Sequence, residues 1–160
     1  TSQESVQALF EKIGPVDAIV SASGGLYFGP LATMKDSDFN QGLQDKLLGQ
    51  VRLALTGQHY LNEGGSITLI SGIVAHEPIA QGVNATTVNA ALEGFVRAAA
   101  CELPRGIRIN LISPTVLTES AEAYDGFFPG FESVPAATVA QAYRRSVEGV
   151  QSGRVYKVGY

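Results

Sequence analysis

The sequence predicts an α/β fold in which helices pack on a doubly wound parallel sheet of about four strands. Two observations carry this prediction. Short apolar runs alternate along the chain with longer segments whose apolar residues recur at the spacing of a helix. Each run is also followed by Gly, Ser or Pro, residues that commonly begin the loops after buried parallel strands. The expected strands cover residues 17–22, 66–70, 107–112 and 155–158.

Helices are expected before and between these strands. The first begins at a capping box formed by Thr1 and Glu4, whose side chains bond free backbone donors, and it ends at Gly14. The others cover residues 36–61, residues 84–102 and the segment that follows Pro135. Leucine and valine occupy more than one face of the 36–61 helix. We therefore expect it to be buried on two sides, within the domain or against a second subunit.

Length and composition are typical of a single soluble domain covering residues 1–160. The chain has 160 residues, of which 45% are hydrophobic and 16% are charged, and its formal net charge is −4. It lacks the basic run expected of a protein that binds nucleic acid or an anionic membrane. No apolar run reaches the roughly 18 residues of a membrane span, and the N-terminus does not resemble a signal peptide, so a cytoplasmic location is expected.

Cysteine and histidine are scarce. Cys101 lies in an apolar helical run and is expected to be a buried small hydrophobic residue. The two histidines, His59 and His76, are too few for a metal site, and none is expected.

The carboxyl ends of the expected strands predict a ligand site. Ligands bind at this edge of a parallel sheet, and the ends here are Ser21 to Gly25, Ser71-Gly72 and Pro114 to Thr118. Glycine allows a close approach of the backbone, and hydroxyl groups can bond a ligand. The segment 115–134 is long and irregular and is expected to be a lid or part of an interface.

Several stretches resemble motifs of the short-chain dehydrogenase/reductase family, in the family's order. Residues 17–24, DAIVSASG, are similar to the strand motif Asp-x-x-Val-Asn-Asn-Ala-Gly, and residues 64–72, GGSITLISG, to the strand that carries the catalytic serine. Residues 89–95, NAALEGF, with Glu102-Leu103, are similar to Lys-Ala-Ala-Leu-x-x-Phe followed by Glu-Leu. Residues 108–114, RINLISP, resemble the entry to the nicotinamide site, and residues 153–156, GRVY, resemble the last strand.

The resemblance implies a Rossmann-like sheet, an oxidoreductase activity and the cofactor NADP or NAD. It assigns the cofactor to the strand ends at Ser21, Ala22, Ser23, Gly24, Pro114, Thr115, Val116 and Thr118. The family's glycine-rich turn is absent from this chain. The sheet is therefore expected to be truncated at the N-terminus, and dinucleotide binding to need a preceding segment. As in the family, a homodimer is expected through the helices 36–61 and 84–102.

The resemblance also implies a degenerate active site. Alignment on residues 89–92 places the family's lysine at Asn89, its tyrosine at Ala85 and its serine at Gly72. Lys46 corresponds to an asparagine of the family. Alanine has no proton to transfer and glycine has no hydroxyl, so the usual carbonyl reduction cannot run on these positions.

Lys46 and Ser71 are the catalytic candidates that remain. Lys46 could place a positive charge near the nicotinamide or a substrate carboxylate, and Ser71 could replace the lost serine after a shift of one residue. His76 lies in the loop after the strand 66–70 and is a further candidate, because an imidazole can act as an acid or a base. Tyr27 and Tyr124 are loop phenols that could donate a proton.

Three functions stay open at this point. The first is an oxidoreductase that transfers hydride between NADP(H) or NAD(H) and a small carbonyl compound or alcohol. The second is a non-catalytic sensor or scaffold that holds the dinucleotide without turnover. The third is a structural dimerisation domain that binds no cofactor.

Overall fold

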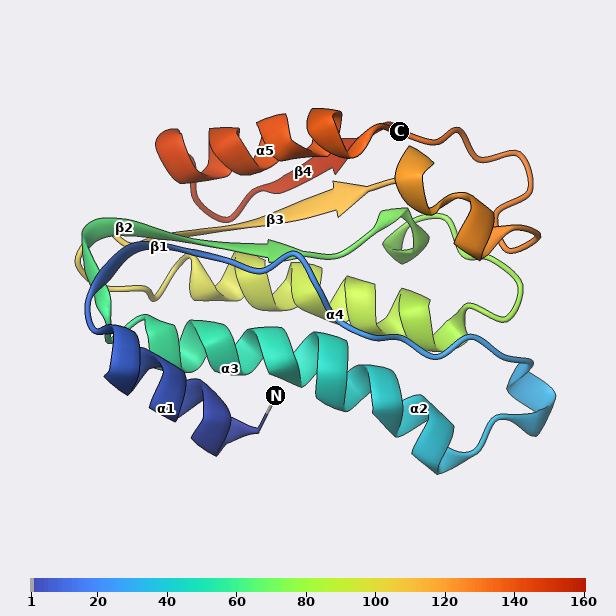
Figure 1. Ribbon diagram of the computed structural model, residues 1–160, viewed down its shortest axis with the longest axis horizontal. Coiled ribbons are helices and arrows are strands. Elements are labelled where there is room, and N and C mark those ends of the chain that lie inside the picture. The colour runs from blue at the N-terminus through green and yellow to red at the C-terminus, as the bar shows by residue number, and fades with distance from the viewer. Residues whose placement is uncertain (1) are drawn as a thin grey trace.

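The chain folds into a parallel β-sheet with helices on both faces (Figure 1). The computed structural model describes residues 2–160. The strands are β1 Val16–Val20, β2 Leu61–Ile70, β3 Arg108–Pro114 and β4 Val155–Val158. They lie in the order β1-β2-β3-β4, and each neighbouring pair is parallel. The predicted α/β fold with four parallel strands is confirmed.

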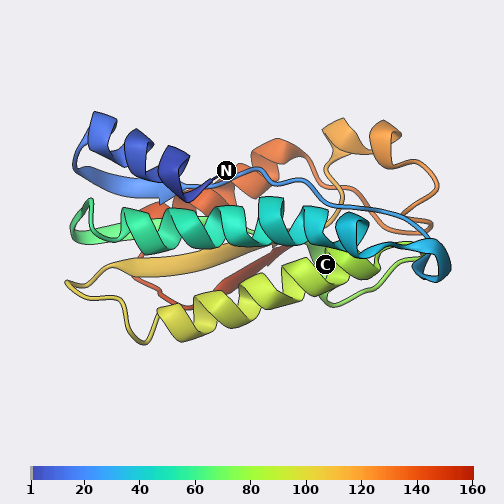
Figure 2. The same cartoon turned by 90° about the horizontal axis from the view of Figure 1, so that it is seen from below.

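The helices divide between the two faces of the sheet. Helices α1 Gln3–Ile13, α3 Leu48–Gly57 and α4 Val83–Ala99 cover one face, and α5 Ala136–Glu148 covers the other (Figures 1 and 2). Helix α2 Asp36–Gly42 leads into α3 through residues Leu43–Leu47, which have π-helical hydrogen bonds. None of the helices in residues 2–160 is long and apolar enough to cross a membrane.

The core forms where alternate side chains of the central strands meet the helices. Its fully buried residues include Ile67, Leu69, Val88, Leu92, Val96, Ile109 and Leu111. On the opposite face of the sheet, the Thr68 hydroxyl lies 2.7 Å from the Ser146 hydroxyl of α5, and the Asn110 amide donates to the same hydroxyl over 3.2 Å. Apolar contacts therefore hold the helices on one face of the sheet, and these hydrogen bonds help to hold α5 on the other.

The prediction of one continuous helix over residues 36–61 is wrong in two respects. It is divided by the π-helical segment, and its last turn ends at Gly57. Phe10 and Ile19 press against the backbone there and leave no room for a Cβ. The chain then turns into β2 at Leu61. The apolar pattern continues across this turn, so periodicity alone did not reveal it.

The helix expected over residues 84–102 is also too long. It ends at Ala99, and the N–H groups of Cys101 and Glu102 then bond carbonyls three residues back, as in a tight turn. Cys101 is exposed in this turn, so its expected burial is wrong.

The first residue of β2 and the capping residue of α1 differ from expectation. Strand β2 begins at Leu61 rather than at residue 66, and its register with β1 shifts around Gly64, whose φ is +72°. An irregular extension of the strand thus replaces a separate turn. Thr1, the expected helix cap, lies outside the described residues. Ser2 caps α1, and its Oγ accepts a backbone hydrogen bond from the first turn over 3.2 Å.

The segment 115–134 returns to its own start. Leu117 and Val134 form an isolated parallel bridge. The N–H of Thr118 donates to Val134 O, and the N–H of Val134 donates to Val116 O, each over 2.9 Å. Short 3-10 turns, Thr118–Ser120 and Glu122–Tyr124, fill part of the segment. It lies at the end of the sheet to which the strand arrows point (Figure 1).

Candidate active site

A cavity of about 190 Å³, here called the Lys46 cavity, lies at the carboxyl ends of β2 and β3. This is the edge at which the sequence predicts a ligand site. The lining residues come from the loop after β1, the π-helical segment, the end of β2 and the turn after it, α4, and the segment after β3. They are Leu26, Phe28, Lys46, Ile70, Ser71, Gly72, Ile73, Val74, Asn89, Pro114, Thr115, Val116, Leu117, Ser120, Tyr124 and Phe128.

Lys46 is the only charged residue in this lining. It is 8% exposed, and its Nζ donates a hydrogen bond to the main-chain oxygen of Ser71 over 3.2 Å. No ion pair found in residues 2–160 includes it. Burial lowers the pKa of the Lys46 ammonium to about 8. At neutral pH the cavity therefore holds a buried cation without a carboxylate partner.

The π-helical segment and Gln50 together place Lys46. A π-helical turn is a local widening of a helix and is frequent at functional sites. The Gln50 amide nitrogen donates to the carbonyls of Lys46 and Ile70 over 3.1 and 2.9 Å, and the Ile70 N–H donates to Gln50 Oε1 over 2.8 Å. The side chain of Gln50 thus joins the helix at Lys46 to the end of β2, next to Ser71.

Gly24 and Gly25 let the loop after β1 approach the same helix. A Cβ on Gly24 would lie 2.7 Å from Lys46 Cγ, so only glycine leaves the lysine stem in place. The N–H of Gly25 donates to Asp45 Oδ2 over 2.8 Å. The carboxylate beside Lys46 in sequence is therefore bonded to the loop.

Two buried polar atoms of the cavity lining have no hydrogen-bond partner among residues 2–160. They are Ser71 Oγ and Asn89 Oδ1, and their residues are 3% and 1% exposed. An unpartnered buried polar atom costs about 1–3 kcal/mol. Such atoms beside a cavity are explained most directly by a polar ligand that bonds them.

The positions aligned with the family's catalytic residues differ from one another in their surroundings. Ala85 is fully buried in a small apolar cluster with Ile73 and Val74 and does not line the cavity. Gly72 does line it, and a Cβ there would lie 3.7 Å from Asn89 Nδ2. Helix α4 therefore brings an amide to the cavity but no phenol.

The predicted cofactor residues fall into two groups. Pro114, Thr115 and Val116 line the Lys46 cavity, together with the catalytic candidates Lys46 and Ser71. The remaining predicted residues, Ser21, Ala22, Ser23, Gly24 and Thr118, lie outside this lining. The carbonyl of Ser21 accepts a hydrogen bond from Tyr143 Oη over 3.0 Å, and Thr118 Oγ1 donates to Ser133 Oγ over 3.1 Å.

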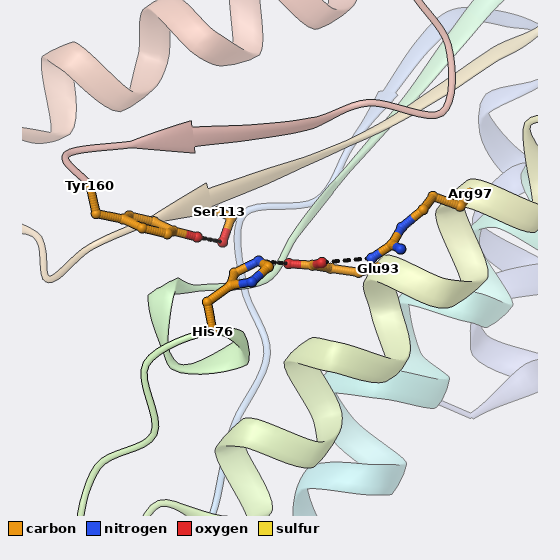
Figure 3. Close-up of polar contacts among 5 residues, drawn as sticks. All are labelled: His76, Glu93, Arg97, Ser113 and Tyr160. Atoms are coloured by element: carbon orange, nitrogen blue, oxygen red, sulfur yellow. Dashed lines mark hydrogen bonds and ion pairs between the residues drawn. The ribbon is translucent and has the colours of Figure 1, made fainter.

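Among the loop candidates, Tyr124 lines the cavity, whereas Tyr27 and His76 do not. Figure 3 shows His76 bonded to Glu93 of α4, over 2.7 Å from Nε2 to Oε1. The other oxygen of this buried carboxylate accepts from Arg97 over 2.8 Å. The spacing of Glu93 and Arg97, one helical turn apart, is the signal that could have identified this pair.

A second polar contact lies near His76. The hydroxyls of Ser113 and Tyr160 are 2.6 Å apart (Figure 3), and the His76 and Tyr160 rings are 6.1 Å apart between centroids. Burial is the main cause that raises the pKa of the Tyr160 phenol.

No group of three or more His, Cys, Asp and Glu side chains in residues 2–160 could hold a metal ion.

Aromatic side chains form one wall of the cavity. This ring cluster consists of Phe28, Tyr124, Phe127, Phe128 and Phe131. Its ring centroids are 5.2 to 6.0 Å apart, mostly in edge-to-face arrangements. This cluster was not predicted from the sequence, although the run FFPGF at residues 127–131 is a signal for it.

Comparison with known proteins assigns the family. The profile described as enoyl-(acyl carrier protein) reductase matches residues 1–151. The chain belongs to the short-chain dehydrogenase/reductase family. This short-chain dehydrogenase/reductase is 32% identical over 113 residues to the short-chain reductase protein NovJ of Streptomyces niveus, a match that covers 69% of the chain and 43% of NovJ. It is 30% identical over 110 residues to the hydroxynaphthalene reductase arp2 of Aspergillus fumigatus, with 68% and 40% covered.

Solved structures of related proteins have the same fold. The protein lin1944 from Listeria innocua is 45% identical, with a TM-score of 0.96 over 98% of this chain and 78% of that one. A small-chain dehydrogenase in complex with NADPH is 27% identical, with a TM-score of 0.87 over 98% and 78%. The short-chain dehydrogenase/reductase described here spans less than half the length of the curated relatives named above.

Proposed function

We propose that this protein is an NAD(P)-dependent oxidoreductase that acts on a small carbonyl compound or the corresponding alcohol at the Lys46 cavity. The observation that carries the proposal is the set formed by Lys46, Ser71 and Asn89. It combines a buried cation with two unpartnered oxygens at the edge of the sheet where ligands bind. The related dehydrogenase in complex with NADPH supports a nicotinamide dinucleotide as the cofactor.

The residues of the cavity fit the nicotinamide end of such a cofactor. Asn89 Oδ1 is a buried acceptor without a partner in the described part of the chain, which suits a hydroxyl donor. Pro114, Thr115 and Val116 would hold the nicotinamide from the end of β3. When bound, the cofactor supplies or takes up hydride. Binding of its pyrophosphate is proposed to need the family's glycine-rich turn, which residues 1–160 do not contain.

Lys46 and Ser71 are proposed to act on the substrate oxygen in place of the family's phenol. The Lys46 ammonium stabilises negative charge on that oxygen inside a mostly apolar cavity, where a charge acts strongly. Ser71 Oγ, which has no partner in residues 2–160, donates a hydrogen bond to the same oxygen. The pKa of about 8 allows Lys46 to transfer a proton near neutral pH.

A non-catalytic nucleotide sensor is the second candidate function. It is favoured by Ala85, which is fully buried at the position aligned with the family's tyrosine. A protein of this kind would hold the reduced dinucleotide without oxidising it.

Fluorescence titration of the full-length protein with NADH and NADPH, followed by a panel of carbonyl compounds, separates these functions. The oxidoreductase binds one of the reduced cofactors and oxidises it with at least one carbonyl compound. Lys46→Met should retain cofactor binding and lose most of the turnover. Equal turnover in Lys46→Met and the unaltered protein would remove Lys46 from the mechanism. Tight binding without turnover would favour the sensor.

We also propose a homodimer through α3 and α4. Residues from both helices line a hollow on their outer side, including Leu55, Phe95 and Ala98, and Leu55 is 51% exposed. Light scattering should give the mass of a dimer, and Leu55→Asp with Ala98→Asp should give that of a monomer. A monomer mass for the unaltered protein would contradict the proposal.

A further inference from the structure

The charge of Lys46 is the feature of the cavity that points to a particular class of ligand. Among residues 2–160, its Nζ has one hydrogen-bond acceptor, the main-chain oxygen of Ser71. An ammonium can donate three hydrogen bonds, and a buried ammonium is costly unless an anion compensates it. The carboxylate beside it in sequence, Asp45, is bonded to Gly25. No residue of the cavity lining is acidic. A ligand that completes this site therefore carries a negative charge.

The other lining residues of the cavity indicate the chemistry of the other end of the ligand. Three members of the ring cluster, Phe28, Tyr124 and Phe128, line the cavity. Tyr124 stands edge-on to Phe128, at 87° with centroids 5.8 Å apart, and Phe28 is tilted by 63° to Tyr124. Rings prefer to meet other rings and apolar groups in these arrangements. An apolar body that contains a ring fits this wall, whereas a small hydrated anion leaves it without a partner.

The unpartnered hydroxyl of Ser71 joins these two parts. It belongs to the residue whose main-chain oxygen accepts from Lys46. An oxygen-bearing group held by the ammonium therefore lies next to a free O–H donor. A carboxylate has enough lone pairs for both, and so has the adjacent pair of oxygens in a 2-oxo acid.

We infer that the Lys46 cavity binds the carboxylate of an apolar, ring-bearing acid, with Lys46 as its counter-ion and Ser71 as a hydrogen-bond donor. The inference rests on the proposed function in that such an acid, as a 2-oxo acid or the corresponding 2-hydroxy acid, is the substrate class of the proposed reaction. Binding of the carboxylate itself requires no cofactor.

The test measures binding without cofactor, by calorimetry at neutral pH, on the full chain. The probe is 3-phenylpropanoate, and its matched neutral form is 3-phenylpropanamide. Because a charge-assisted hydrogen bond contributes more than a neutral one, the acid should bind about tenfold more tightly than the amide. Acetate and inorganic phosphate, which lack a ring, should bind at least about tenfold more weakly than the acid.

Variants locate the effect. Lys46→Met should abolish the preference for acid over amide, Ser71→Ala should reduce it, and Lys12→Met, at an exposed position of α1, should leave it unchanged. Thermal unfolding of each variant shows whether it is folded. Equal affinities for acid and amide, no binding of either, or equal affinity for acetate would each overturn the inference.

A second measurement separates this inference from the proposed function. In the full-length protein with NADH and NADPH, turnover of phenylpyruvate is compared with that of phenylacetone, which has the same ring and ketone but no carboxylate. Binding of 3-phenylpropanoate without turnover of either ketone supports the carboxylate site and contradicts the oxidoreductase. Equal turnover of both ketones, with no preference for acid over amide, supports the oxidoreductase and contradicts the carboxylate site.

Discussion

The ammonium of Lys46 donates a hydrogen bond to the main-chain oxygen of Ser71 over 3.2 Å, and within residues 2–160 that side chain makes no other hydrogen bond. A neutral carbonyl offsets only part of the cost of burying a charge. The pKa of Lys46, lowered by burial to about 8, expresses this imbalance. The first prediction follows from it.

Lys46→Met should stabilise the protein at neutral pH. Burial lowers the pKa of Lys46 from its ordinary value of 10.5 to about 8, which corresponds to on the order of 3 kcal/mol. Between these pH values the unfolded chain binds more protons than the folded one, so the free energy of unfolding should rise with pH in the unaltered protein. Urea unfolding from pH 7 to 10 should show this rise, and Lys46→Met should lack it.

Lys12→Met serves as the control, because Lys12 is exposed in the last turn of α1. Its unfolding should follow that of the unaltered protein across the whole pH range. A rise of the same size in Lys46→Met would show that another group causes it.

Gln50→Ala should lower the free energy of unfolding by about 2–4 kcal/mol, because it removes hydrogen bonds to Lys46 O and to both backbone groups of Ile70. Gln141→Ala, at an exposed position of α5, should change stability by no more than about 0.5 kcal/mol. Both free energies come from urea unfolding. Similar losses in the two variants would show that Gln50 does not hold the helix to β2.

Gly24→Ala and Gly94→Ala should change stability in opposite directions. A Cβ on Gly24 would lie 2.7 Å from Lys46 Cγ, and the φ of Gly24 is +148°. We expect a loss of more than about 1 kcal/mol. Gly94 lies within α4, and beyond the neighbouring backbone of that helix no atom lies within 4 Å of an added Cβ, so alanine should raise the free energy of unfolding by about 0.5–1 kcal/mol. Thermal unfolding of the two variants in parallel checks the prediction, which fails if Gly24→Ala is as stable as the unaltered protein.

Tyr143→Phe tests a hydrogen bond that crosses from α5 to the end of β1. Tyr143 Oη donates to Ser21 O over 3.0 Å, and burial raises the pKa of this phenol. Loss of this hydrogen bond should lower the free energy of unfolding by about 1 kcal/mol below pH 10. Above about pH 10 the unfolded phenol ionises while the folded one stays neutral, so the unaltered protein loses stability as pH rises. The difference in the free energy of unfolding between the unaltered protein and Tyr143→Phe should therefore become smaller as pH rises. A gap that is constant with pH would show that Tyr143 ionises equally in both states.

Local patterns were sufficient to predict the sheet. The strands are short apolar runs with clear ends, and the last one, Val155–Val158, matches the expectation at both ends. Helix ends were harder to predict, because Gly57 ends α3 through tertiary contact with Phe10 and Ile19 rather than through a local signal. The π-helical turn at Leu43–Leu47 was not predicted either, since its sequence LQDKL is compatible with an ordinary helix.

The candidate site could be predicted in part. Lys46, Ser71 and Pro114 to Val116 were named from strand ends and motifs, and the structure brings them to one cavity. The unpartnered state of Ser71 Oγ depends on neighbours far apart in sequence, so no local pattern encodes it. The ring cluster also joins Phe28 to residues about a hundred positions later, a separation that spacing rules do not cover.

The bridge between Leu117 and Val134 makes the segment between them a self-contained unit. Its entry and exit are pinned to each other, and Thr115 Oγ1 also donates to Glu132 O over 2.9 Å. The carboxylate of Glu119 accepts from the N–H of Ala136 at the start of α5, so the part that can change without disturbing β3 or α5 is residues 121–131. Evolution, or an engineer who exchanges this loop as a cassette, can retune ligand shape while the lysine and its scaffold stay unchanged.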